Sequence, residues 1–168
     1  MKTIKERREK QRENINPDIE KHYTPLETVR YCLKKLKLRK NDLVLDVGSG
    51  LNMIWYNNIN CKKDWVEIDK QKDFFNYNKQ VDWCIGNPPF RNLWDYLEKA
   101  FKISKKGVAF LLAVDFWNRL TQKRLRIMKE LGFNITEINV LEVKKWFGRY
   151  FFIKFEKNKK GVINFNIK

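Results

Sequence analysis

Residues 82–90, Asp-Trp-Cys-Ile-Gly-Asn-Pro-Pro-Phe, restrict the fold of this chain more than any other segment. The apolar run at 83–85 predicts a short buried strand that ends at Gly86. Two prolines follow Asn87, and a proline fixes its own φ and cannot donate to a sheet ladder. Each proline also pushes the residue before it out of the helical region. The segment therefore predicts a stiff, extended turn at the carboxyl end of a strand, which is where open α/β sheets bind ligands.

The predicted turn offers two hydrogen-bond acceptors, the side-chain oxygen of Asn87 and the carbonyl oxygen of Pro88. Together they could hold a planar amino group through both of its hydrogens, while the ring of Phe90 stacks on the ring that bears the amine. Because both hydrogens are then engaged, the lone pair of the nitrogen stays available to attack an electrophile. The alternative interpretation is a proline-stiffened loop between a strand and a helix, with Phe90 in the core.

Asn-Pro-Pro-Phe after an apolar strand resembles the catalytic motif of S-adenosylmethionine-dependent amino-methyltransferases, whose best-known members methylate N6 of adenine in DNA. The same tetrapeptide also occurs in enzymes that methylate RNA bases and in enzymes that methylate the glutamine amide of release factors. The motif therefore indicates the chemistry more than the substrate. The resemblance implies catalytic roles for Asn87, Pro88, Pro89 and Phe90, with Asn87 also contacting the cofactor.

A second motif lies earlier in the chain, where an apolar strand at 43–47 leads into Asp46-x-Gly48-x-Gly50. Glycines at such a turn let the backbone approach a ligand closely. Roughly twenty residues later a second predicted strand reaches Glu67, whose carboxylate could accept both ribose hydroxyls of a nucleoside cofactor. The third glycine of the NAD-binding pattern is absent, because position 53 is Met. The pattern resembles the cofactor loop and ribose acid of class I methyltransferases.

The segment Tyr23-Thr24-Pro25 precedes an apolar-periodic stretch at 26–36 that predicts a helix, with Thr24 as its N-cap and Glu27 completing a capping box. The segment also resembles the one that closes over the methionine end of the cofactor in the adenine-N6 family. This resemblance implies that Tyr23, Thr24 and Pro25 bind the cofactor.

Asp73-Phe74 resembles the family motif whose acid binds the adenine amino group while the aromatic ring packs against the base. Only residues 70–72 separate Asp69 from this motif, so the helix that usually precedes it is expected to be deleted. The alternative is that Phe74 simply belongs to the core.

In the second half of the chain the apolar patterns predict a helix at 93–101, a buried central strand at 108–114, a helix at 119–131 and strands at 135–143 and 150–155. The sequence Lys-Lys-Trp-Phe-Gly-Arg at 144–149 lies between the last two strands. Basic and aromatic residues together can hold phosphates and stack a base. The position resembles the family loop that supports a flipped base, which implies substrate binding by Trp146, Phe147 and Arg149. A hairpin with packed aromatics is the alternative.

The composition limits the partners of the protein. Its 36 Lys and Arg residues against 20 Asp and Glu give a net charge of +16, which favours a polyanion, although an AT-rich gene would also enrich lysine. Three scattered cysteines and one histidine predict neither a metal site nor a disulfide framework, and we expect a cytoplasmic location and no membrane span. The dense charges near the N-terminus predict a basic charged arm at 1–16, and the length of 168 residues predicts a single domain at 17–168, which the resemblance implies is a methyltransferase domain.

We therefore expect an α/β, Rossmann-like class I methyltransferase fold: a mostly parallel seven-stranded sheet with an antiparallel last strand, in which one flanking helix can be missing. The resemblance implies S-adenosyl-L-methionine as the cofactor and direct in-line methyl transfer to N6 of adenine in nucleic acid, with DNA favoured over RNA. A separate subunit could supply target recognition. The alternatives are methylation of an RNA adenine or guanine amine, methylation of a protein glutamine, and a nucleic-acid-binding module without catalysis.

Overall fold

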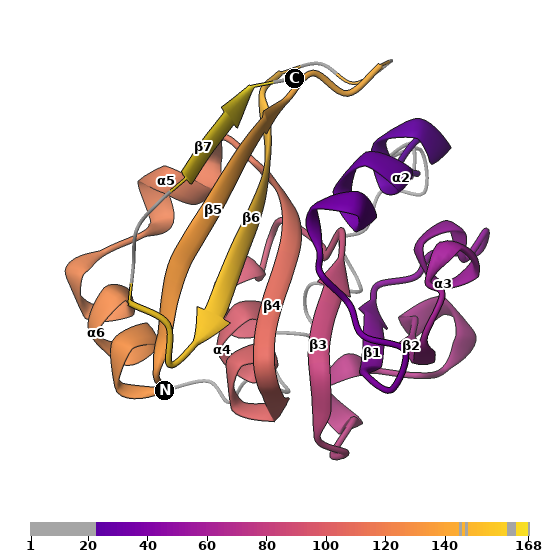
Figure 1. Cartoon of the computed structure of the whole chain (residues 1–168), viewed down its shortest axis with the longest axis horizontal. Helices are drawn as coiled ribbons and strands as arrows, with labels where there is room; N and C mark the ends of the chain where they lie inside the picture. The colour runs from indigo at the N-terminus through magenta and orange to yellow at the C-terminus, as the bar shows by residue number, and fades with distance from the viewer. Residues whose placement is uncertain (1–22, 145, 147, 161–163, 168) are drawn as a thin grey trace.

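The computed structural model describes residues 23–144, 146, 148–160 and 164–167, and the predicted basic arm at 1–16 lies outside them. A seven-stranded sheet with the order β2-β1-β3-β4-β6-β5-β7 forms the centre of the described chain (Figure 1). The strands are β1 (Leu43–Val47), β2 (Lys62–Val66), β3 (Val81–Gly86), β4 (Ser104–Ala113), β5 (Phe133–Leu141), β6 (Tyr150–Lys157) and β7 (Asn164–Ile167).

Strands β1 to β4 are parallel to one another, and β6 is antiparallel to both of its neighbours, β4 and β5. The predicted last strand at 150–155 is β6, so its antiparallel direction is confirmed. The chain then adds β7, which pairs parallel with β5 and which we expected only as a lysine-rich edge. The predicted Rossmann-like α/β fold is confirmed.

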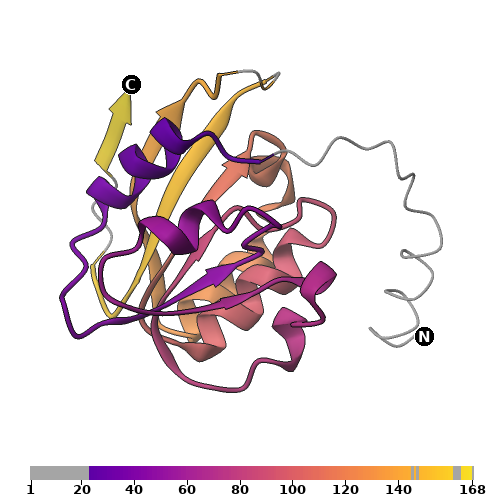
Figure 2. The ribbon, with the colours of Figure 1, turned by 90° about the vertical axis from the view of Figure 1, so that its right-hand side faces the viewer.

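Helices cover both faces of the sheet (Figure 2). Helices α2 (Leu26–Lys35) and α3 (Ile54–Asn58) pack on one face, and α4 (Leu93–Ile103), α5 (Asp115–Arg119) and α6 (Gln122–Glu130) pack on the other. Successive residues of β4 point to opposite faces, so that Phe110 belongs to the core beneath α4 and Leu111 to the core beneath α2 and α3. This burial on both faces explains why β4 is an unbroken apolar run in the sequence.

No α-helix lies between β2 and β3. Residues 67–80 instead contain two 3₁₀ turns, η1 (Ile68–Lys70) and η2 (Phe74–Asn76). A connection between parallel strands takes a dozen or more residues and usually contains a helix. Residues 67–80 are therefore too few to form both a helix and an additional strand beside β2. As a result β2 lies at one edge of the sheet, and β7, at the other edge, is the seventh strand.

The helix expected at 119–131 is α6, which begins at Gln122 because Thr121 caps it by accepting a hydrogen bond from the amide of Arg124. The short helix α5 before it was not expected. One local prediction was wrong. Thr24 does not cap α2, whose N-cap is Pro25 without a side-chain cap. The hydroxyl oxygen of Thr24 accepts a hydrogen bond of 3.2 Å from Nε1 of Trp55 instead.

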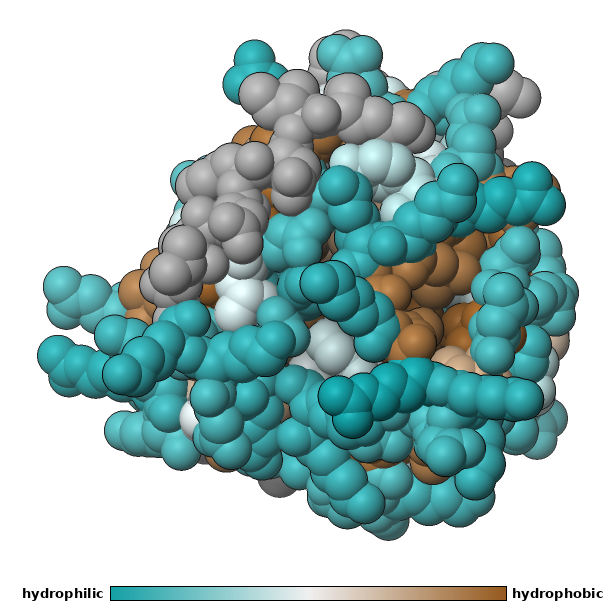
Figure 3. Space-filling view, in the orientation of Figure 1, coloured by the Kyte–Doolittle hydropathy of each residue, from teal (hydrophilic) through white to brown (hydrophobic). Residues whose placement is uncertain are grey.

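The surface agrees with the polar composition of the chain. The face shown in Figure 3 is mostly hydrophilic, and its exposed apolar atoms gather on the right-hand side, where α2 and α3 lie. Across the described residues, none of the helices combines the length and the apolar character that crossing a membrane requires.

Candidate functional site

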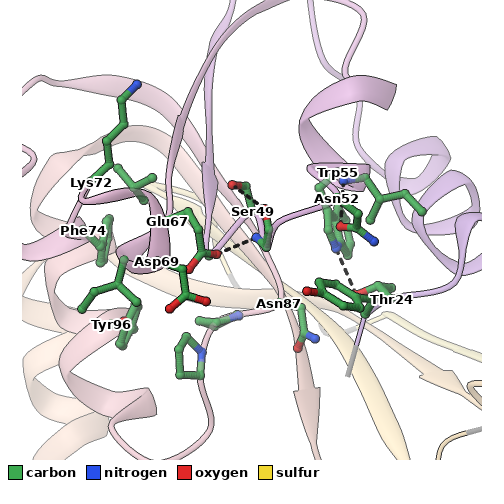
Figure 4. Close-up of a pocket in the computed structure, with 18 of the residues that line it drawn as sticks. Thr24, Ser49, Asn52, Trp55, Glu67, Asp69, Lys72, Phe74, Asn87 and Tyr96 are labelled. Carbon is green, nitrogen blue, oxygen red and sulfur yellow. Dashed lines mark hydrogen bonds between the residues drawn. The ribbon is translucent and has the colours of Figure 1, made fainter. Parts of the chain in front are cut away.

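A cavity of about 390 Å³ opens at the carboxyl ends of β1, β2 and β3 (Figure 4). Four segments form its wall: the residues before α2, the loop after β1, the turns after β2, and the proline turn with the start of α4. The lining residues are Tyr23, Thr24, Gly48, Ser49, Gly50, Asn52, Ile54, Trp55, Val66, Glu67, Ile68, Asp69, Lys72, Phe74, Asn87, Pro88, Pro89, Phe90, Arg91 and Tyr96. The cavity lies at the edge of the sheet where open α/β folds bind ligands.

The turn after β3 begins at Gly86, whose φ is 133°. A Cβ atom at this position would lie 2.7 Å from the carbonyl oxygen of Val47 and 3.0 Å from Oδ1 of Asp46, so only glycine fits between β3 and β1. The close approach of the two strands sets the direction in which Asn87 leaves the sheet.

The side-chain oxygen of Asn87 is buried in the wall of this cavity, and it has no hydrogen-bond partner among the described residues. A buried acceptor without a partner costs about 1–3 kcal/mol, so such a group needs an explanation. A ligand that donates a hydrogen bond would satisfy it. The other motif residues, Pro88, Pro89 and Phe90, line the same cavity.

The glycine loop is tied to the second strand by hydrogen bonds. The amides of Gly48 and Ser49 donate to the carbonyl oxygen of Val66, each at 3.1 Å. The amide of Gly50 donates to Oε2 of Glu67 at 2.6 Å, while Oε1 of Glu67 accepts from the amide of Asp69 at 3.2 Å. The structure therefore brings the predicted loop and the predicted acid together in one wall of the cavity.

Asp46 is held beneath the cavity rather than in its lining. Its side chain is fully buried, and its Oδ2 accepts a hydrogen bond of 2.9 Å from the amide of Tyr56 in α3. Burial raises the pKa of Asp46 to about 8, mainly because the charged form is removed from water. Asp46 therefore connects β1 to α3, and any contact with a cofactor would be indirect.

Of the other predicted cofactor residues, Tyr23, Thr24 and Phe74 line the cavity, whereas Pro25 and Asp73 do not. The carboxylate of Asp73 accepts a hydrogen bond of 3.0 Å from the amide of Phe75 and caps η2. Two acids do line the cavity, the predicted Glu67 and Asp69, and both are labelled in Figure 4. Asp69 was not among the predicted site residues, whereas the predicted Asp73 lies outside the lining.

The loop before β6 lies at the same edge of the sheet, because Ala113 at the end of β4 pairs with Tyr150. Two of its predicted substrate residues, Trp146 and Arg149, are not part of the cavity lining. The ring of Trp146 packs on that of Tyr150 with a centroid distance of 4.9 Å, and Arg149 is exposed while its carbonyl oxygen accepts from the amide of Val114. Phe147 lies outside the described residues.

Several lining residues escaped the sequence analysis, among them Asn52, Trp55, Asp69, Lys72 and Tyr96. The ring of Tyr96 stacks on that of Phe74 at 5.4 Å and 12°. Tyr96 could have been predicted as a lining residue from its position, because it lies in the first turn of the helix that follows the proline turn. Nothing in the local sequence of the remaining residues distinguishes them from ordinary loop or core positions. Among the described residues, no group of His, Cys, Asp or Glu could hold a metal ion.

Several solved protein structures resemble this chain over most of its length. A proposed RNA methyltransferase from Pyrococcus horikoshii is 21% identical with a TM-score of 0.66, and the match covers 94% of this chain and 99% of that one. A proposed class I S-adenosylmethionine-dependent methyltransferase from Listeria monocytogenes is 15% identical with a TM-score of 0.63, covering 94% of this chain and 68% of that one. This chain has the class I methyltransferase fold.

A more distant match has a ligand. The magnesium protoporphyrin IX methyltransferase from Synechocystis with bound S-adenosylmethionine is 11% identical with a TM-score of 0.51, covering 78% of this chain and 76% of that one. Neither a protein-family model nor a curated protein sequence matches the chain.

Proposed function

We propose that the cavity binds S-adenosyl-L-methionine and that the protein methylates an exocyclic amine. When bound, this cofactor supplies an electrophilic methyl group. The donor and acceptor groups of the cavity suit such a molecule: the backbone of Gly48 and Gly50 permits close approach, and the carboxylate of Glu67 can accept from the ribose hydroxyls. The class I methyltransferase fold supports this assignment.

The two ends of the cofactor would meet different walls. Asp69 and the stacked pair of Phe74 and Tyr96 suit the adenine end, with Asp69 taking the role that the sequence assigned to Asp73. Thr24 and Asn52 on the opposite wall suit the methionine end, where polar groups are needed for its carboxylate and ammonium. Figure 4 displays Phe74 and Tyr96 on one side and Thr24 and Asn52 on the other, with Glu67, Asp69 and Asn87 between them.

The observation that carries the proposed chemistry is the unpartnered, buried oxygen of Asn87. It lies in the same cavity wall as the glycine loop, and the position of a Cβ on Gly48 would be 3.6 Å from the carbonyl oxygen of Asn87. The acceptor would hold one hydrogen of the target amine and the carbonyl oxygen of Pro88 the other. The chain's own residues thus orient the amine and leave its lone pair directed away from both acceptors, while Phe90 stacks on the ring.

Adenine N6 in nucleic acid, with DNA first, is the substrate we propose. The net charge of +16 supports a polyanionic partner. Exposed basic residues at the cavity edge of the sheet, namely Arg91, Lys144 and Arg149, could contact phosphates on either side of the target base. The base would have to be single-stranded or flipped out of a duplex. Target recognition by a separate subunit and a cytoplasmic location stay predictions.

RNA is the second candidate substrate. The match to the Pyrococcus horikoshii protein, which is described as a proposed RNA methyltransferase, favours it. The two nucleic acids share the amine, the aromatic base and the phosphates, so the lining of the cavity suits both.

The test is incubation of the full chain with cofactor labelled in the methyl group and with parallel pools of DNA, RNA and protein. Digestion of the labelled pool to nucleosides should give N6-methyl-2′-deoxyadenosine from DNA or N6-methyladenosine from RNA. Asn87→Ala is the matched control, since it removes the acceptor and leaves the glycine loop and Glu67 in place. Label on the protein pool alone, recovered as N5-methylglutamine, would assign the activity to glutamine, and no label in any pool would refute the proposed enzyme.

A further inference from the structure

The side chain of Arg119, at the end of α5, reaches the turn that contains the Asn-Pro-Pro-Phe motif. Its Nη1 donates to the carbonyl oxygen of Phe90 at 3.0 Å and to that of Arg91 at 3.1 Å. Its Nη2 forms an ion pair of 2.8 Å with Oδ2 of Asp115, one turn earlier in α5. One guanidinium group therefore ties the carboxyl end of β4 to the turn at the carboxyl end of β3.

The hydrogen bonds from Arg119 restrain two residues whose backbone the prolines leave free to rotate. Pro88 and Pro89 fix their own φ angles, but Phe90 and Arg91 have no such restriction. Helix α4 begins only at Leu93, and its N-cap has no side-chain cap bond. Among the hydrogen bonds that join described residues, those from Arg119 are the ones that reach the carbonyl oxygens of residues 87–91. The proline pair and Arg119 thus hold successive halves of the same turn.

A second arginine supports the first. Nη1 of Arg124 donates to the carbonyl oxygen of Arg119 at 2.6 Å, and its guanidinium carbon lies 5.2 Å from the ring centroid of Trp94 in α4. Arg124 therefore links the end of α5 to the helix that follows the motif. Arg119 itself does not line the cavity, so it would act on the reaction only through the turn.

We infer that Arg119 is a positioning residue, which sets the backbone at Phe90 and Arg91 so that the Phe90 ring and the Asn87 acceptor keep their relative geometry. The kinetic consequence rests on the proposed methyl transfer, while the structural consequence does not. A displacement of about 1 Å in a reacting geometry can lower a rate about 100-fold. Loss of Arg119 should therefore lower kcat about 10- to 100-fold.

An alternative role for Arg119 is contact with a phosphate of the substrate, because its side chain is 40% exposed. Substitution by lysine distinguishes backbone positioning from phosphate contact. Lysine keeps the charge that attracts a phosphate but loses the planar fork that reaches two carbonyl oxygens. Positioning predicts that Arg119→Lys and Arg119→Gln both lower kcat with little change in KM. Phosphate contact predicts a higher KM for Arg119→Gln and near-parental kinetics for Arg119→Lys.

The experiment combines carbonyl NMR with single-turnover and steady-state kinetics on the full chain. The variants are Arg119→Lys, Arg119→Gln and Asp115→Asn, the last of which removes only the ion-pair partner. Arg126→Gln on the exposed face of α6 is the matched control for the loss of one positive charge. Because a carbonyl carbon responds to the hydrogen bond that its oxygen accepts, the ¹³C resonances of Phe90 and Arg91 should move in the Arg119 variants. Those of the glycine loop should stay in place and so report an intact fold.

The inference is supported if both carbonyl resonances move, kcat falls in both Arg119 variants and added guanidinium ion partly restores the rate of Arg119→Gln. Unchanged resonances, or parental kcat in a folded Arg119→Gln protein, would overturn it. If the parental protein methylates nothing, the proposed function fails, and the NMR result alone then decides whether Arg119 holds the turn.

Discussion

The amide nitrogen of Gly50 lies 2.6 Å from Oε2 of Glu67, so the glycine loop after β1 is fastened to the acid after β2. Two motifs that are 17 residues apart in the chain thereby form one wall of the cavity. The carboxylate orders the loop with one oxygen and the first turn of η1 with the other. Substitution of Glu67 would therefore remove the acceptor that orders the loop as well as the proposed ribose contact.

Glu67→Ala should weaken binding of S-adenosylmethionine strongly. A hydrogen bond to a charged acceptor contributes about 1.5–3 kcal/mol, so the dissociation constant should rise at least about 10-fold. Isothermal titration calorimetry with the cofactor and with its demethylated product measures the change. Glu98→Ala on α4, outside the cavity lining, is the matched control. Parental affinity in a folded Glu67→Ala protein would contradict the proposed ribose contact.

Asp69 and Asp73 give a second prediction, because Asp69 lines the cavity and Asp73, to which the resemblance assigned a cofactor contact, does not. Asp69→Asn should weaken cofactor binding, since Asp69 lines the cavity. Asp73→Ala should leave the affinity within about 2-fold of the parent while it destabilises η2, which loses a side-chain cap worth roughly 0.5–2 kcal/mol. Calorimetry and chemical unfolding together separate the two effects. The reverse pattern would restore the assignment made from the sequence.

The residues whose place at the cavity could be predicted are those that follow directly from the pattern of strands. Gly48, Gly50 and Asn87 follow the ends of apolar strands, and parallel strands bring their carboxyl ends to one edge, so the pattern alone predicts their meeting. Asp73 lies outside the lining, because a carboxylate before a short turn can bond its own backbone, and that local bond is what the structure contains.

Other parts of the site depend on contacts between distant residues. Tyr96 faces the cavity because α4 packs beneath the proline turn, and Arg119 reaches Phe90 from 29 residues away along the chain. Thr24 bonds Trp55, 31 residues away, in preference to capping the helix beside it. Such choices are settled by the packing of α3, α4 and α5 on the sheet, which a single sequence does not encode in any local pattern.

The pKa of Asp46 leads to a prediction about stability. Burial raises this pKa to about 8, from the ordinary value of 3.8, so the folded protein keeps a proton that the unfolded chain loses. The stabilisation is therefore complete at low pH and declines as pH rises from about 4 to 8, by up to about 1.4 kcal/mol per pH unit for one proton. Asp46→Asn should remove this decline, because asparagine stays neutral at every pH. Urea unfolding of both proteins at pH 5 and pH 8 measures the difference, and parallel slopes would contradict it.

Binding to nucleic acid should weaken steeply with salt if phosphates are contacted near the cavity. Each contact adds about 0.9 to the slope of log K against log salt on duplex DNA. The double variant Lys144→Gln and Arg149→Gln should therefore have a shallower slope than the parent. Lys105→Gln with Lys129→Gln, at exposed positions of the opposite edge, removes the same charge as a control. Equal slopes for both double variants would indicate non-specific attraction by the net charge alone.

The proline turn gives the most direct prediction. Asn87→Ala should keep cofactor binding and lose methyl transfer, because the buried oxygen that would hold the amine is removed. Loss of one preorganised polar group typically costs roughly 3–4 kcal/mol, or about 100- to 1,000-fold in rate. Phe90→Ala should chiefly weaken the hold on the base, by about 1–3 kcal/mol, and Phe90→Trp should be milder since an aromatic face is retained. Single-turnover methylation of adenine-containing oligonucleotides, with calorimetry for the cofactor, separates orientation from stacking. A folded Asn87→Ala protein that methylates at the parental rate would reduce the motif to a stiff turn.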